Sequence, residues 1–136
     1  MIEAFSKEVT VASGGNIPLE NVRIKKGQYE AFSGAASIAL NHCGVYRVTV
    51  NGTATPSEAG TFGVELFKDN IAESNTLTQA TAAATSTLLP FSFTTFVQVA
   101  RSNGACACTS PVVLTVVNTG VASVFNNINV TVDKLC

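Results

Sequence analysis

The chain has 136 residues, of which 46% are hydrophobic and 12% are charged, and its formal net charge is −1. This length and composition predict one globular domain, in which charged residues are about half as frequent as the ~25% usual in soluble proteins. The longest basic run is Lys25-Lys26, so no nucleic-acid partner is expected. No apolar run approaches the ~18 residues that cross a membrane. The start of the chain lacks the apolar core of a signal peptide, so we expect a protein that is made and used without secretion, or one that is given in its mature form.

The first segment, residues 1–20, differs from the rest of the chain. Its apolar residues Ile2, Phe5 and Val9 precede a Ser-Gly-Gly break and Pro18. They are too few for a core of their own and too many for a solvated tail. We therefore interpret residues 1–20 as an N-terminal arm with a first edge segment, ahead of one domain over residues 21–136. The arm is expected to dock outside its own sandwich, with Phe5 as the main anchor.

From residue 36 onward, apolar and polar residues alternate in short segments, which is typical of half-buried strands. Residues 76–90, rich in Ala and Thr, are expected to form short extended pieces with a loop. Asp69-Asn70 predicts a turn. The sets expected to face inward are Ala36, Ile38 and Leu40; Tyr46, Val48 and Val50; Phe62, Val64 and Leu66; Phe91, Phe93, Val97 and Val99; and Ile128, Val130 and Val132.

The segment 111–118 is apolar on both of its faces. Leu114 and Val116 share one face, and Val113 and Val117 share the other. A strand of this kind is covered on both sides, either by another subunit or by an overlying segment. Between residues 74 and 132 the only charged side chain is Arg101, which also favours a covered surface. Val113 and Val117 are therefore candidates for a subunit interface.

These segments amount to about eight to ten short antiparallel strands separated by turns. The fold class predicted from them is all-β, with two sheets packed as a jelly-roll sandwich.

The segments GVYRVTVNGTAT (44–55) and FGVELFKDN (62–70) resemble the tumour-necrosis-factor-like and complement globular-head jelly rolls. With NHCGVYRVTV, SPVVLTVVN and the closing NINVTV, the chain resembles a small family of such proteins in phages and prophages of Gram-positive bacteria. This resemblance implies a ten-strand jelly roll, a compact homotrimer, and a structural or binding role on a virion. Unlike many members, the sequence shows no collagen-like or coiled-coil stalk. Nor does it show an acidic calcium cluster: Glu65, Asp69 and Glu73 come nearest to one.

Three cysteines and the single histidine invite a chemical interpretation. Cys43 follows His42, and Cys106 and Cys108 are one residue apart. A zinc site would have suitable ligand types, but these spacings do not turn two ligands towards one ion. A disulfide from Cys43 to Cys106 or Cys108 would close a loop of about 60 residues, worth about 4 kcal/mol. Reduced cysteines that fill small apolar spaces remain the other alternative. No metal or cofactor is expected.

The catalytic motifs of common enzyme classes are missing from the sequence. It has no Gly-x-Ser-x-Gly, no His-Glu-x-x-His and no glycine-rich phosphate loop. We therefore expect no enzyme. The function predicted is a trimeric capsid decoration or stabilising protein of a bacteriophage, bound to the major capsid protein on the virion surface. The alternative is the trimeric head of a fibre or bacterial surface appendage, which binds a host receptor or glycan.

Overall fold

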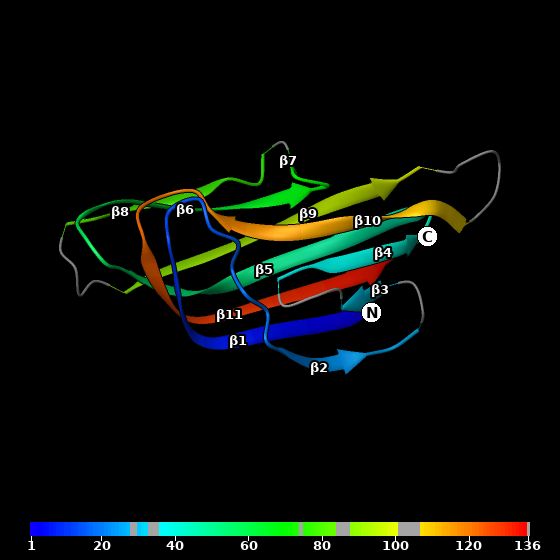
Figure 1. Cartoon of the computed structure of the whole chain (residues 1–136), viewed down its shortest axis with the longest axis horizontal. Coiled ribbons are helices and arrows are strands. Elements are labelled where there is room, and N and C mark those ends of the chain that lie inside the picture. The colour runs from blue at the N-terminus through cyan, green and yellow to red at the C-terminus, as the bar shows by residue number, and fades with distance from the viewer. Residues whose placement is uncertain (28–29, 33–35, 74, 84–87, 101–106, 136) are drawn as a thin grey trace.

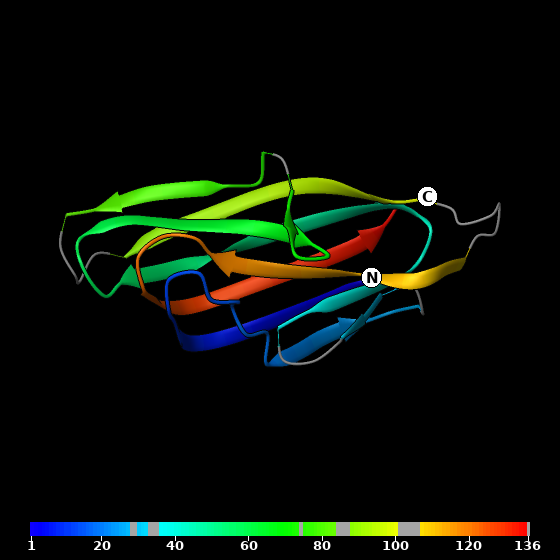
Figure 2. The same cartoon turned by 45° about the horizontal axis from the view of Figure 1, so that its top comes forward.

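The computed structural model describes residues 1–27, 30–32, 36–73, 75–83, 88–100 and 107–135. Every regular element in these ranges is a β-strand. Two antiparallel sheets face each other across one core (Figures 1 and 2). In the described part of the chain, no helix has the length and apolar character needed to cross a membrane.

The five-stranded sheet joins the two ends of the chain. Its order is β2 (Asn21–Lys25), β1 (Ile2–Val11), β11 (Ser123–Lys134), β5 (Gly44–Pro56) and β9 (Leu89–Val99). The first strand thus pairs with the last, from Ile2 opposite Val132 to Val11 opposite Ser123. Both chain ends consequently lie at the same end of the sandwich (Figure 1).

The six-stranded sheet has a similar crossed order. It runs β3 (Glu30–Phe32), β4 (Ile38–His42), β10 (Ala107–Asn118), β6 (Gly60–Lys68) and β7 (Ile71–Ala72), and β8 (Thr78–Ala82) also pairs with β6. Strands distant in sequence are neighbours in both sheets, as a jelly roll requires. The predicted all-β jelly-roll sandwich is therefore confirmed, with eleven strands where the sequence suggested about eight to ten.

The alternating segments supply the core, as predicted. Tyr46, Val48 and Val50 of β5 are fully buried. Three phenylalanines join the sheets: Phe62 of β6 lies with its ring centroid 5.6 Å from those of both Phe91 and Phe125, which belong to the opposite sheet. Aromatic pairs at such separations are favourable beyond the area that they bury.

Glycine at position 52 of β5 makes room for this aromatic cluster. A Cβ built at Gly52 would clash with the carbonyl oxygen of Asn127 and lie 2.8 Å from Cζ of Phe91. The Asn51-Gly-Thr sequence therefore has a packing role inside the sheet.

The N-terminal segment is a strand of the sandwich, and its interpretation as an arm was wrong. Ile2 and Ala4 are fully buried and belong to the core of their own chain, and Val9 packs against it. The alternation changes phase at Glu8, whose φ is 27° and which the β1–β11 register skips. The register is the same on both sides of this point, but the change of phase explains why the segment did not look like one continuous strand. Residues 1–11 are thus not an arm that docks elsewhere.

The connection between β1 and β2 closes one side of the sandwich. Ile17 and Leu19 are buried in the core, and the backbone at Asn16 bridges to Val117 of β10. The Ser6 hydroxyl fixes the segment, because it donates to the Pro18 carbonyl at 2.6 Å and accepts from the Glu20 amide at 2.8 Å.

Asn118, at the end of β10, ties the two sheets together and is itself fully buried. Its Nδ2 donates to the carbonyls of Val11 at 3.3 Å and Val121 at 3.0 Å. Its Oδ1 accepts from the Gly120 amide at 3.1 Å. A buried amide with these bonds made is well accommodated, since an unsatisfied one would cost free energy.

The predicted turn at Asp69-Asn70 is present and is anchored to β10. Both residues have positive φ, 51° and 66°, as in the two-residue type I′ hairpin turn that connects β6 to β7. The Asp69 amide donates to the Val113 carbonyl at 2.8 Å, and the Val113 amide donates to Asp69 Oδ1 at 2.9 Å.

β10 contains the segment that is apolar on both faces, with the candidate interface residues Val113 and Val117. The rest of the same chain already covers most of Val117. Val117 keeps only 7% of its surface exposed, so it has little area left for a subunit contact. Val113 is half-buried and retains more. A subunit contact at these residues stays a prediction.

We expect deletion of residues 1–12 to abolish cooperative unfolding, because it removes an inner strand of the five-stranded sheet. Circular dichroism during thermal denaturation measures this. As matched point variants on β1, Ala4→Asp buries an unpaired carboxylate and should destabilise the protein by several kcal/mol, whereas Thr10→Asp, at an exposed position of the same strand, should have little effect. A truncated protein with an unchanged melting temperature would restore the arm interpretation.

We expect Phe62→Ala to lower the free energy of unfolding by about 3–5 kcal/mol, because it leaves a cavity between the sheets. Urea denaturation measures the change. Ile71→Ala is the control, because Ile71 is 73% exposed. Equal small effects of the two substitutions would show that the aromatic cluster is not the centre of the core.

Candidate functional site

The cysteine-bearing segments approach each other at one end of the six-stranded sheet. The register of β4 and β10 places His42 opposite Ala107. Cys43 is buried, and the Tyr46 hydroxyl donates to the His42 carbonyl at 2.7 Å. Cys106 and the Cys108 side chain lie outside the described residues. The choice between a disulfide and reduced cysteines therefore stays open.

Among the described residues, no three His, Cys, Asp or Glu side chains gather as a group that could hold a metal ion. Glu65, Asp69 and Glu73 lie on or beside the β6–β7 hairpin. Asp69 is engaged there with the backbone of Val113.

Uncharged polar side chains cover part of the outer surface of the five-stranded sheet. We call this part the neutral face; it consists of Thr49, Asn51, Ser92, Thr94, Asn129 and Thr131. The register aligns them in two rows across β11, β5 and β9. Within one row, the Thr49 and Thr94 hydroxyls are 3.3 Å apart. Between the two rows, the Thr131 hydroxyl donates to Asn129 Oδ1 at 3.2 Å.

Charged residues border the neutral face and are paired with each other. Arg47 lies 3.4 Å from Asp133 on one side, and Arg23 lies 2.9 Å from Glu3 on the other. Glu3 Oε1 is buried and makes no well-aligned hydrogen bond, so attraction of charge holds this second pair. The opposite charges offset each other within these two pairs, whereas Lys7 of β1 adds a positive charge beside the face.

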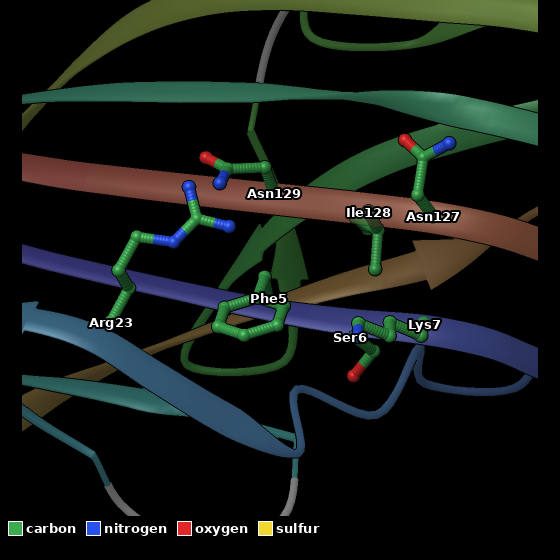
Figure 3. A pocket seen from close by; sticks show the side chains of 7 residues that line it. All are labelled: Phe5, Ser6, Lys7, Arg23, Asn127, Ile128 and Asn129. Atoms are coloured by element: carbon green, nitrogen blue, oxygen red, sulfur yellow. The ribbon is translucent and has the colours of Figure 1, made fainter.

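A hollow opens beside the neutral face, where β1, β2 and β11 meet (Figure 3). Its volume is about 270 Å³, and its lining consists of Phe5, Ser6, Lys7, Arg23, Asn127, Ile128 and Asn129. The Arg23 guanidinium lies over the Phe5 ring, 4.8 Å from its centroid, in a cation–π contact. Amide groups, two cations and an aromatic ring thus converge on one opening. We call it the Phe5 hollow.

Sequence reasoning singled out Phe5 but placed it on an arm, and it missed the partners of Phe5. Arg23, Asn127 and Asn129 reach the hollow from strands that begin and end the domain. Phe5 lies opposite Asn129 on one side and Asn21 on the other, a register that no local pattern specifies. One feature of the sequence could have indicated the hollow: the alternation of residues 2–7 places the aromatic Phe5 on the same side as charged residues, facing away from the core.

Comparison with solved structures supports the fold. The chain is similar to PRD1 vertex protein P5, with a TM-score of 0.60 and 16% sequence identity over 99% of this chain and 96% of that one. At this identity the likeness establishes the jelly-roll architecture.

Other similarities are weaker. A CBM35 from Paenibacillus barcinonensis aligns with 95% of this chain and 91% of its own at 15% identity, with a TM-score of 0.36. An acetyl xylan esterase from the rumen bacterium Butyrivibrio proteoclasticus aligns with all of this chain but 34% of its own at 10% identity, with a TM-score of 0.29. Neither value supports an argument. No protein-family model matches the sequence, and no curated protein matches it either.

We expect the double substitution Cys106→Ser and Cys108→Ser to leave the fold and assembly intact and to lower the melting temperature modestly. Scanning calorimetry with and without reductant tells the two alternatives apart. With a disulfide to Cys43, reductant lowers the melting temperature of the parent protein but not of the variant. With reduced cysteines, reductant changes neither. Stoichiometric zinc, or unfolding on addition of a chelator, would contradict both.

Proposed function

We propose that this chain is a structural protein of a bacteriophage virion, which assembles as a homotrimer and decorates or stabilises the capsid. The observation that carries the proposal is the similarity of almost the whole chain to a vertex protein. The sequence resemblance to trimeric jelly rolls of phages points to the same role. In this proposal the protein is made in the host cytoplasm and binds the major capsid protein at the virion surface.

The charge distribution supports assembly with other copies. The neutral face carries hydroxyl and amide groups only, and two ion pairs of opposite charge lie at its borders. The described surface of β8 and β9 belongs to a stretch without formal charge, residues 74–100. Interface cores are depleted in charge relative to the rest of a protein surface. These surfaces are therefore suited to burial between subunits.

Attachment to the capsid then depends on the folded sandwich. Because β1 is an inner strand, residues 1–11 are not available as a separate tether. We infer that a trimer presents three equivalent surfaces to the shell, so that weak contacts act together. The role is structural, with no catalysis.

The second candidate is the trimeric head of a fibre or appendage that binds a host receptor or glycan. The Phe5 hollow favours it, because an aromatic ring with amide and cationic donors can recognise a polar ligand. In this alternative the protein stands at the tip of an appendage and the hollow is open.

We expect light scattering at micromolar concentration to give about three times the chain mass of 14.1 kDa. Gold-labelled antibody on virions whose genome encodes the chain should mark the whole shell. Label confined to fibre tips would favour the second candidate, and virions without label would overturn both. A monomer that persists over a hundredfold dilution range would overturn the trimer alone.

A further inference from the structure

The homotrimer, which belongs to the proposed function, places a condition on the surface of each copy. Three copies close a ring only through a heterologous interface, in which two different patches meet. Each copy must therefore carry two different patches that fit one another.

One such patch lies along β9, an edge strand of the five-stranded sheet. The chain has no charged residue from position 74 to 100, and Phe96 and Leu88 are 60% and 61% exposed. Edge strands are usually protected from association by charges. β8 of the other sheet contacts part of β9, and near one end of β9 the Lys68 Nζ donates to the Gln98 carbonyl at 2.8 Å. Phe96 itself projects outward, beside Arg47 of β5.

The opposite edge of the same sheet has the contrary character. The strand β2 and its flanks carry Glu20, Arg23, Lys25 and Lys26. Their charges favour contact with water. The contrast identifies β9 as the edge suited to burial.

The second patch is the Phe5 hollow. It lies on the same outer surface as Phe96 but towards the β1–β2 side, and β5 lies between β9 and β11, the last strand that lines the hollow. Phe5 and Phe96 are three strands apart, which is about 14 Å across the sheet. They are also offset by four residues, about 13 Å, along the strands, because the register puts Phe5 in the row of Ser92 and not in that of Phe96. When three copies turn this surface towards a threefold axis, the β9 side of each meets the β1–β2 side of the next. The two patches face one another at each junction when the strands are inclined to the axis by about 45°, because that inclination brings Phe96 and the hollow to the same height.

We propose that Phe96 of each copy packs into the Phe5 hollow of the next copy. The hollow measures about 270 Å³, and a cavity of about 150 Å³ already accepts a benzene ring. Phe5 offers apolar contact, and the Arg23 guanidinium over it can also face the incoming ring. The occupant is a second copy of this chain, because its β9 edge is uncharged and the ring must close on itself.

The charge of the hollow allows a sharp test. Lys7 and Arg23 line it, and Glu3 pairs with Arg23 from the side. A cation at position 96 would enter a site that already contains cations, whereas an anion would meet Lys7. Because Phe96 is mostly exposed in the single chain, either substitution should leave the fold of that chain intact.

The experiment measures the trimer dissociation constant by sedimentation equilibrium for the parent and four variants. Phe96→Lys should weaken assembly by on the order of 100-fold or more, since it buries an unpaired charge among like charges. Phe96→Glu should weaken it by a factor at least ten times smaller. The double variant Phe96→Lys, Lys7→Glu should regain most of the loss. Ile71→Lys, at an exposed position of the other sheet, is the control and should assemble normally.

The outcomes separate this inference from the proposed function. A trimeric parent whose Phe96→Lys variant is also trimeric overturns the Phe96 contact and leaves the trimer standing. Equal losses for Phe96→Lys and Phe96→Glu, or no regain in the double variant, show that Phe96 is buried elsewhere. A monomeric parent overturns both. Binding of an oligosaccharide to the hollow of the intact trimer, lost in Phe5→Ala, overturns the contact and supports the receptor-binding role.

Discussion

Pairing between the first and the last strand of the chain is the constraint on which the rest of the structure depends. β1 lies between β2 and β11, and its inward side chains Ile2, Ala4 and Val11 complete the core. The neutral face and the Phe5 hollow both need this pairing, because β11 supplies part of each. Closing the sheet joins residues more than a hundred positions apart, a long-range contact of the kind that slows folding. The site therefore exists only when the whole chain has folded.

The strands that local patterns predict are those with uninterrupted alternation. Tyr46, Val48 and Val50 face inward as expected, and the Asp69-Asn70 turn has the positive φ values that such residues tolerate. Side-chain period and turn chemistry are local properties, and so the sequence alone reveals them. The jelly-roll class followed from their number and spacing.

The features that sequence reasoning missed depend on partners rather than on local pattern. The burial pattern of β1 changes phase at Glu8, where φ is positive, so the segment resembled an arm. Ile17 and Leu19 lie in an irregular connection without a strand-like alternation of apolar and polar residues, yet both are buried in the core. The Phe5 hollow combines three strands whose mutual register is set by the closed sheet. The sequence did not predict a contact at Phe96, because Phe96 lies on the polar side of its strand and single exposed apolar residues are common on protein surfaces.

The common position of the two chain ends has a practical consequence. Ile2 pairs with Val132, so Met1 and Leu135 emerge at one pole of the sandwich. The turns that contain Ser57 and Ala122 lie at the other pole. A hydrogen bond joins them, in which the Ser57 amide donates to the Ala122 carbonyl at 2.8 Å. Any peptide or protein fused genetically to either end would be displayed from the same pole, and the remote turns would stay unobstructed. Such a polarity suits a scaffold that carries two different cargoes in one direction.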